Sequence, residues 1–423
     1  MLLSLLLLLL MVRGTKASHY RGTIVTYYPK ETSDGSVSVI LFFKFNFNTC
    51  QDDSFSCTEN CGNESLIRSN TNFEHVTGSW CQTERITSRS LSNNSPFQLV
   101  YNSANWITNK NDIGSWRAVA VVELRIRSDT NKPNSSPQTT IFPVLRVPSN
   151  CDRNINLLAF DPDGDEVKCR YADLSLTECD PPCRPPPVLS LSSNCTFSFR
   201  TTSSSNEGSY AEVCSLSSMV MEDFPRQEIT LTHTDGSNVE KIPSDKISMI
   251  PIQFAFQVDS AAPSCTEGAY LPKFLSPTPE HGTRLYSPVN KALKINIRAA
   301  TTKSVITGLL YSGPYNVFKS YYGSGNFTLT WTPSPSESGQ SHPICFVVQA
   351  SVSTSVYQSE LRCVIVTVRN TFLTVVNQYT LTTLSLNDEK DRILKAIKDK
   401  LIEKGFQQDI TFCLLNNSSA DNV

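Results

Sequence analysis

The N-terminal part of the chain alternates apolar and polar residues with a period of two. From Val37 to Phe47 every second residue is apolar, which places these side chains on one face of an extended strand. The stretch 22–28 also has strand composition, and Ser33-Asp34-Gly35 lies between the two as a turn sequence. The pattern predicts a hairpin with one covered face, and residues 117–127 predict a further strand.

The stretch 50–112 between these strands shows no comparable alternation. It holds four cysteines, Cys50, Cys57, Cys61 and Cys81. We expect a loop-rich segment that is stabilised by disulfides more than by its own core.

Two later segments, 151–260 and 261–368, repeat one order of elements. Each has a sequon at the start of an alternating strand (194–199 and 326–331), then a Ser-rich or Pro/Ser-rich turn with glycine, then a closing apolar strand (252–258 and 361–368). The order predicts two diverged copies of one β module.

The last segment, 369–423, changes character. Residues 373–384 and 410–415 predict strands, while 388–404 predicts a helix with Asn387 as its N-cap and Gly405 as its stop. The segment is expected to be a small β-α-β appendix.

An apolar run of about 12 residues opens the chain, from Met1 to Val12. It is shorter than the roughly 20 residues that span a bilayer, and Thr15-Lys16-Ala17 after it is a small-x-small cleavage sequence. We interpret residues 1–17 as a signal peptide; the alternative is a buried N-terminal helix. No later run has bilayer length, so we expect no membrane span after signal cleavage.

Composition supports a mostly β protein of more than one domain. The 423 residues include 18% charged residues, and 37 Lys and Arg against 39 Asp and Glu leave a net charge of −2. A chain without basic excess has no means to neutralise a phosphate backbone, so we expect no nucleic-acid partner.

Fourteen cysteines and several glycosylation sequons are typical of an oxidising, extracellular compartment. The sequons are Asn63, Asn93, Asn134, Asn194, Asn326, Asn416 and Asn417. The gaps between cysteine clusters predict an N-terminal disulfide-rich β domain (18–127) and a Pro/Ser-rich connector (128–150) before the two modules. We predict the disulfides Cys345–Cys363 and Cys151–Cys169. Zinc at the Cys57/Cys61 or Cys179/Cys183 pairs is the weaker alternative.

Two sequences carry a family resemblance. Leu329-Thr330-Trp331-Thr332-Pro333, with Gly339 and the strand 345–350, looks like the C-terminal half of immunoglobulin-like and cadherin-like modules. The motif Asp161-Pro162-Asp163-Gly164-Asp165-Glu166-Val167-Lys168-Cys169-Arg170 resembles one in a largely uncharacterised family of secreted or cell-surface animal proteins with such tandem modules. The resemblance implies β-sandwich architecture and an extracellular setting, and it brings no established activity.

Asp161, Asp163 and Asp165 place three carboxylates within five residues, the oxygen-rich chemistry that Ca²⁺ prefers. An EF-hand is excluded because Ala172 stands at the twelfth loop position. A cadherin-like calcium site remains open, and so does a plain turn in which Gly164 takes a positive φ between paired strands 155–160 and 167–171. No cofactor other than calcium is expected.

The histidines (His19, His75, His233, His281 and His342) lie in polar stretches where exposure is expected, and no Gly-x-Ser-x-Gly elbow is present. These features favour a secreted, N-glycosylated protein with a non-enzymatic binding or adhesion role and an extracellular protein or glycan as ligand. The alternatives are an extracellular hydrolase with a dispersed catalytic site and a shortened form of a membrane-anchored receptor.

Overall fold

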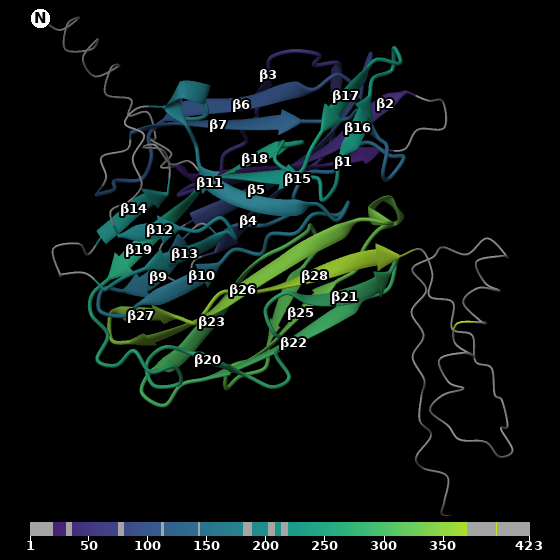
Figure 1. Ribbon diagram of the computed structural model, residues 1–423. Helices are drawn as coiled ribbons and strands as arrows, with labels where there is room; N and C mark the ends of the chain where they lie inside the picture. The colour runs from purple at the N-terminus through teal and green to yellow at the C-terminus, as the bar shows by residue number, and fades with distance from the viewer. Residues whose placement is uncertain are drawn as a thin grey trace, which may run out of the picture. The chain divides into compact units, whose positions relative to one another are not determined.

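The structure, a computed structural model, is built almost entirely from β-strands, which confirms the predicted class (Figure 1). It describes residues 20–30, 36–74, 80–110, 114–142, 144–180, 188–201, 208–212, 219–369 and 395. Short 3-10 turns at Leu174–Leu176 and Pro335–Glu337 interrupt the strands. The predicted signal peptide (1–17) and, apart from Arg369 and Lys395, the predicted β-α-β appendix (369–423) lie outside the described residues.

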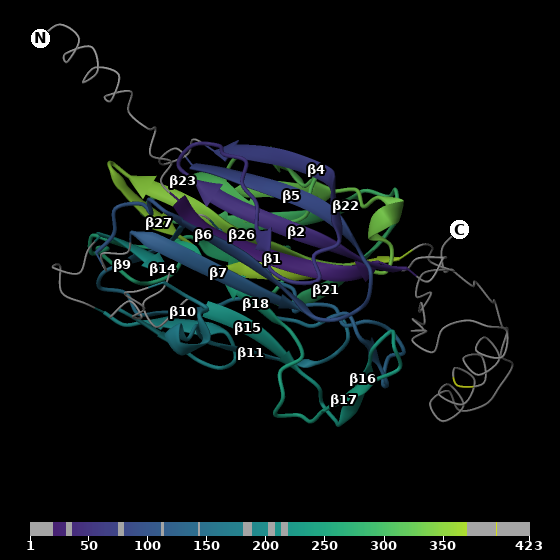
Figure 2. The same cartoon turned by 90° about the horizontal axis from the view of Figure 1, so that it is seen from above.

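A ten-stranded sheet dominates the N-terminal part. Its main path runs β3-β6-β7-β18-β1-β2-β5-β4, and β11 and β15 extend from β18. The strands are β1 (Tyr20–Lys30), β2 (Val37–Phe47), β3 (Ser56–Cys57), β4 (Asn63–Glu74), β5 (Trp80–Leu91), β6 (Phe97–Ala104), β7 (Ser115–Val122), β11 (Glu166–Tyr171), β15 (Met219–Phe224) and β18 (Met249–Ile252). The predicted hairpin is β1–β2, and Figure 2 shows these strands beside β5 and β4. The alternating face of β2 is buried, as expected.

Strand β18 shows that the predicted division between residues 18–127 and 151–260 is wrong. β18 comes from the second segment but lies between β7 and β1 of the first. Contact here is close, because Gly22 has φ +126° and a Cβ added to it would lie 2.0 Å from the Gln253 carbonyl oxygen. The two segments therefore share one sheet.

The expectation of a loop-rich stretch at 50–112 is also wrong. β4 and β5 each have 12 residues and pair along their length, and β6 pairs with β7. Side chains such as Phe97 and Leu99 are buried in the same core as β2. Alternation is hidden here because polar side chains such as Thr87 and Arg89 are buried as well.

The second and third segments share a strand plan, as the repeat predicted. The second has the sheets β10-β13-β12 and β14-β19-β9; the third has β20-β22-β25-β24 and β21-β28-β26-β23, with β27 beside β26. In both, the last strand pairs in parallel with an early one: β19 pairs with β9, which lies in the predicted connector 128–150, and β28 pairs with β21. The bounds are β9 (Val144–Pro148), β10 (Arg153–Asn156), β12 (Leu189–Leu191), β13 (Thr196–Phe199), β14 (Gly208–Glu212), β19 (Phe254–Asp259), β20 (Lys273–Leu275), β21 (Thr283–Pro288), β22 (Leu293–Ala300), β23 (Val305–Ser312), β24 (Phe318–Tyr321), β25 (Asn326–Trp331), β26 (Ser341–Val352), β27 (Ser355–Gln358) and β28 (Arg362–Arg369).

A small sheet, β17-β16-β8, completes the described strands. Its members are β8 (Ile126–Arg127), β16 (Ile229–Thr232) and β17 (Asn238–Lys241). It brings Arg127 next to the segment that follows β15, and Arg127 is fully buried there.

The predicted connector 128–150 is part of the core for much of its length. Residues 134–142 are buried, and Ser136 bonds to β1 through the Tyr27 amide, which donates to Ser136 Oγ at 2.9 Å. Thr140 reaches the third segment, with its Oγ1 2.6 Å from Ser312 Oγ. The Pro/Ser-rich composition reflects an extended chain whose polar groups bond to neighbouring strands, rather than a solvated linker.

Five disulfides are present between described cysteines. Cys345–Cys363 is the predicted pair, whereas Cys151 bonds to Cys265 and Cys169 bonds to Cys195, so the predicted Cys151–Cys169 pair is wrong. The cause is the sheet assignment: β10 pairs with β13 and β11 with β15, so 155–160 and 167–171 do not form the expected hairpin. The other bridges are Cys50–Cys81 and Cys57–Cys61, the latter a disulfide rather than a zinc pair.

Peptide mapping under non-reducing conditions should therefore recover Cys151 linked to Cys265 and Cys169 linked to Cys195. Both pairs have Cα separations, 5.4 and 5.0 Å, that suit an unstrained bridge. A peptide joining Cys151 to Cys169 would contradict the sheet assignment of β10 and β11.

Candidate metal centre

The loop 161–165 joins two sheets and is held by its own backbone. Gly164 takes φ +91° with open space around its Cα, as the turn sequence predicted. Asp161 Oδ1 accepts the amide N–H of Asp163 at 2.8 Å and of Asp165 at 3.3 Å. Arg226 Nε donates to the Gly164 carbonyl at 2.7 Å. Asp161 and Asp165 are buried, and Asp163 is half-buried.

Asp161 has one carboxylate oxygen without a hydrogen-bond donor. The residue is 8% exposed, and its Oδ2 is buried without a hydrogen-bond partner. Burial raises the pKa of Asp161 well above its ordinary value, and the negative charges of Asp223, Asp163 and Asp165 raise it further. A buried carboxylate oxygen without a donor is unfavourable, so Oδ2 is expected to bind either a proton or a cation.

Asp163 and Asp165 differ in how they are compensated. Asp163 accepts from the Ser135 amide at 2.6 Å and from Ser135 Oγ at 3.3 Å, yet burial raises its pKa to about 6. Asp165 forms a bidentate pair with the Arg127 guanidinium. The charge of Asp165 is therefore neutralised by Arg127. Asp161 accepts hydrogen bonds only from backbone amides in these contacts and is not paired with a positively charged side chain.

Arg127 uses all five of its N–H donors within this cluster. Besides Asp165, it donates to both carboxylate oxygens of Asp129, at 3.0 and 2.8 Å, and to Asn134 Oδ1 at 2.6 Å. Its hydrogen bond lowers the pKa of Asp129. Because its donors are saturated, Arg127 has none left for Asp161 or Asp163.

Asp223 of β15 is a member of the cluster that the sequence analysis missed. It accepts from the amide and Oγ of Ser248 at 2.8 and 2.7 Å and from Asn134 Nδ2 at 2.8 Å. Burial raises its pKa to about 6. The available signal was an acidic pair, Glu222 and Asp223, inside the otherwise apolar run 219–224, where a charge needs a partner.

The cluster thus carries more negative than positive charge. Arg127 donates hydrogen bonds to two of the cluster's five carboxylates, Asp129 and Asp165, and lies 3.9 Å from Asp163. The other two carboxylates, Asp161 and Asp223, have no ion pair among these contacts. Asp161, Asp163 and Asp165 each offer one oxygen, and these oxygens lie within 4.8 Å of one another. Such a set of oxygens could hold a hard divalent cation such as Ca²⁺.

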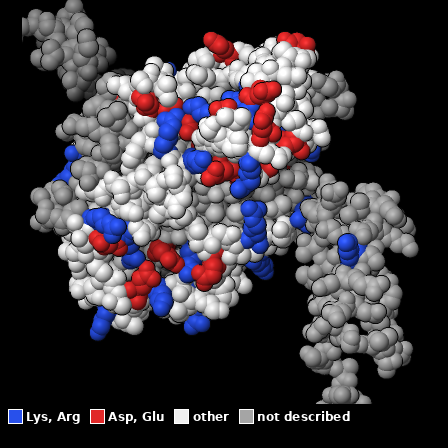
Figure 3. Space-filling view, in the orientation of Figure 1, with Lys and Arg blue, Asp and Glu red and all other residues white. Residues whose placement is uncertain are grey.

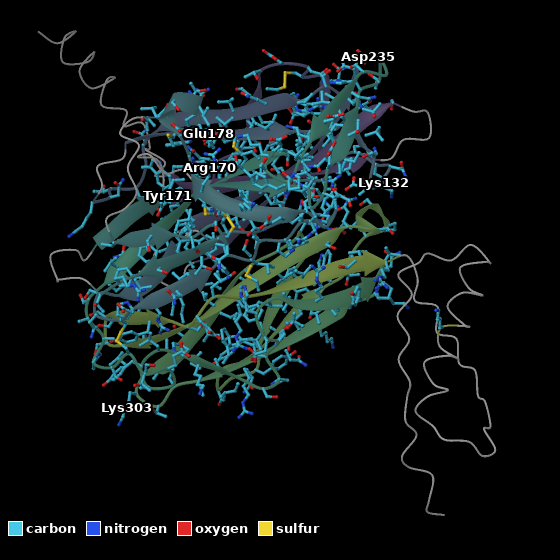
Figure 4. The ribbon with its side chains drawn as sticks, viewed as in Figure 1. Lys132, Arg170, Tyr171, Glu178, Asp235 and Lys303 are labelled. Atoms are coloured by element: carbon cyan, nitrogen blue, oxygen red, sulfur yellow. A yellow bond between two sulfur atoms is a disulfide. The ribbon has the colours of Figure 1, made fainter. Side chains whose placement is uncertain are left out.

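A surface cavity of about 500 Å³ lies along β11 and is lined by Arg170, Tyr171, Phe224 and Lys246, among others. Figure 4 labels Arg170, Tyr171 and Glu178 in this region. Arg170 donates to Glu178 at 2.8 and 2.9 Å, to Glu222 at 3.0 and 2.7 Å and to the Tyr171 carbonyl at 3.0 Å. Its five donors are used, so the pair of buried glutamates is neutralised by Arg170 and Lys246 and serves the fold.

The histidines are placed differently from the expectation of exposure. His342 is buried against Trp331, with ring centroids 5.3 Å apart, and desolvation lowers its pKa to about 3. It therefore stays neutral at physiological pH. His233 and His281 are half-buried, while His19 and His75 lie outside the described residues.

The sequons divide into accessible and inaccessible positions. Asn63 and Asn194 are exposed, and Asn93 and Asn326 are half-buried. Asn134 is fully buried, and its Nδ2 donates to Asp223, so the expected glycan at Asn134 is incompatible with this fold. Asn416 and Asn417 lie outside the described residues.

On the face shown in Figure 3, basic and acidic side chains are interspersed over the described surface. Within the described part of the chain, no helix is long and apolar enough to cross a membrane.

No family model and no curated protein matches this chain. Among solved structures, it overlays weakly on an endo-fucoidan hydrolase of glycoside hydrolase family 107 (13% identity, 72% of this chain, 39% of that chain, TM-score 0.19). Weak overlays also occur on the N-terminal four Ig domains of Dscam1 isoform 1.9 (8%, 56% and 53%, TM-score 0.17) and the N-terminal eight Ig domains of DSCAM isoform 1.30.30 (9%, 82% and 49%, TM-score 0.15). The chain spans about two fifths of the hydrolase and about half of each Ig fragment.

Proposed function

We propose that the protein is a secreted, N-glycosylated binding or adhesion protein without enzymatic activity. The observation that carries the proposal is the set of five disulfides between strands and loops of a β protein. Cytosolic thiols are kept reduced, so a chain built around such bridges belongs in an oxidising compartment. The signal-like N-terminus and the exposed sequons Asn63 and Asn194 support the same location.

A binding role is favoured over catalysis by how the charged groups are used. In the cavity along β11, Arg170, Glu178 and Glu222 satisfy one another. In contrast, apolar side chains are exposed on two outer strands: Leu66 on β4, at 54%, and Phe318 and Tyr321 on β24, at 56% and 57%. Exposed apolar groups on outer strands suit contact with an extracellular protein or glycan.

The acidic cluster has a structural role in this proposal. Ca²⁺ held by Asp161 and Asp163, with Asp165 alongside, would neutralise two carboxylates to which Arg127 donates no hydrogen bond, although its Nη1 lies 3.9 Å from Asp163. The residues involved come from β8, from 129–135, from 161–165 and from β15. An ion there stabilises the junction of these segments.

Expression in animal cells should place the protein in the medium, with a lower mass after treatment with peptide N-glycosidase. The secreted chain, captured on beads and exposed to extracellular fluid, should then retain a protein or glycan ligand identified by mass spectrometry. Retention in the cytosol at the unmodified mass would contradict the proposal.

Glycan mapping of the same material should find Asn63 and Asn194 occupied and Asn134 empty. The reason is burial, since a glycan on Asn134 would have to displace Arg127 and Asp223 from its amide. A fully occupied Asn134 in folded, secreted protein would show that the cluster is assembled differently.

A further inference from the structure

The β24–β25 hairpin places an exposed aromatic ring directly opposite a glycosylation sequon. Tyr321 pairs with Phe327, so the next pair toward the turn is Tyr322 and Asn326. Two backbone bonds close the turn: Tyr322 N–H donates to the Asn326 carbonyl and Asn326 N–H donates to the Gly323 carbonyl, both at 2.9 Å. The first of these bonds joins Tyr322 directly to Asn326 and places the two residues side by side at the start of the turn.

The two side chains share the outer face of the sheet. Along β25, Phe327 and Leu329 point into the core of the third segment, so Asn326, Thr328 and Thr330 point to the other face. Side chains of directly opposed residues lie on the same face, with Cβ atoms about 5 Å apart. Tyr322, which is 70% exposed, therefore stands beside Asn326.

We propose that the first N-acetylglucosamine attached to Asn326 packs its apolar face on the ring of Tyr322. This inference rests on the proposed secretion of the protein. Attachment forms a bond between Asn326 Nδ2 and C1 of the sugar, breaks the bond from C1 to a polyprenyl-pyrophosphate donor, and transfers the amide proton to the departing pyrophosphate. Thr328 completes the sequon Asn326-Phe327-Thr328.

The Asn326 amide can carry a sugar without losing its place in the turn. Nδ2 donates to the Gly323 carbonyl at 3.1 Å and to the Ser324 carbonyl at 3.3 Å. After glycosylation the amide keeps one of its two N–H groups. This N–H can still donate to the carbonyl of Gly323 or of Ser324. The C–H groups of the sugar ring then meet the electron-rich face of an aromatic ring, a favourable contact that also covers exposed apolar surface.

Asn63 provides a matched control within the same protein. It also lies on a strand and in a sequon, but the residue opposite is Ser90, which is exposed and has no ring. A glycan at Asn63 therefore has no stacking partner in the cross-strand position.

The test compares glycan removal in the presence and absence of the ring, in secreted protein trimmed by endoglycosidase to a single N-acetylglucosamine. N326Q removes the turn hydrogen bonds of Asn326 in both backgrounds, so it should lower the Tm by about 1–3 °C more when Tyr322 is present than in Tyr322→Ser. Tyr322→Phe should keep the loss, because the ring remains. N63Q should leave the Tm unchanged with either residue at 322.

An equal Tm loss on N326Q with and without the ring would overturn the inference. So would an empty Asn326 in secreted protein whose Asn63 is occupied, although secretion itself would then stand. If every sequon is empty and the chain stays in the cell, the proposed function fails together with the inference.

Discussion

Replacing Arg127 with methionine should lower the Tm of the protein by about 4–7 °C. The guanidinium is fully buried and donates to Asp165, Asp129 and Asn134. Its loss leaves the buried carboxylate of Asp165 without a counter-charge and removes the cation that lies 3.9 Å from Asp163. Breaking a buried pair from one side costs about 3–5 kcal/mol, and a unit of this size converts that into a shift of several degrees. Thermal denaturation followed by circular dichroism measures it.

Arg200 is the control for this substitution. Its pair with Asp152, at 3.5 Å, is exposed on both sides, with 75% and 51% of the side chains accessible. Exposed pairs contribute about 0–1 kcal/mol, so Arg200→Met should leave the Tm nearly unchanged. Arg127→Lys, which keeps the charge and loses the bidentate geometry, should fall between the two. Equal Tm values for R127M and R200M would mean that Arg127 does not neutralise the cluster.

Replacing Asp161 with asparagine should have opposite effects with and without Ca²⁺. In the presence of a chelator, D161N should be more stable than the native chain, because an amide nitrogen replaces the partnerless Oδ2 and removes a buried charge, while Oδ1 still holds the loop. In Ca²⁺ the native chain should gain about 1–3 kcal/mol at 10 mM if the dissociation constant is about 10⁻⁴ to 10⁻³ M. D161N should show no such gain.

The Ca²⁺ gain should also increase with pH. Raised pKa values mean that the folded state holds protons on Asp161, Asp163 and Asp223 more tightly than the unfolded chain does. The stability from Asp163 and Asp223 is present below their unfolded pKa of 3.8 and is lost as the pH rises through their folded pKa of about 6. The raised pKa of Asp161 acts in the same direction. An ion that replaces the protons restores that stability, so the gain should be larger at pH 7.5 than at pH 5.

Asp235 is the control for the calcium experiment. It holds a similar turn, in which Oδ1 accepts the Ser237 amide at 2.9 Å beside Gly236, but the site is exposed. Asp235→Asn should leave the Ca²⁺ gain intact. If the Tm of the native chain is the same in Ca²⁺ and in chelator, the loop 161–165 does not bind Ca²⁺. It would then be a turn whose charge is neutralised by protons and by Arg127.

Local alternation was sufficient to predict strands but not their partners. The apolar residues of β2 and β25 identify a strand and its buried face, because the period of two is a property of the strand itself. The same reasoning wrongly paired 155–160 with 167–171 across a good turn sequence. Which sheet a strand joins depends on segments that are distant in sequence. Strand β18 lies between β7 and β1, and nothing in the sequence near β18 indicates this.

Only part of the candidate site could be predicted, because the rest depends on contacts between distant segments. Asp161, Asp163 and Asp165 are adjacent in sequence, so their clustering could be predicted. Arg127, Asp129, Asn134 and Asp223 join them only through the fold. The sequon at Asn134 predicts a glycosylation site because a sequon carries no information about burial. In the fold, the Asn134 amide instead links Arg127 to Asp223 by hydrogen bonds.

The position of β18 has a consequence for synthesis. The ribosome delivers β1 and β7 first, and β18 follows about 130 residues after β7. At roughly 5–20 residues per second, the nascent chain waits about 6–25 s before the strand between them exists. During that interval the edges of β1 and β7 that β18 will cover are unpaired, which is the arrangement that invites aggregation. Nascent chains that stop before residue 249 should therefore require a chaperone, and full-length chains should not acquire the native sheet until that residue has emerged.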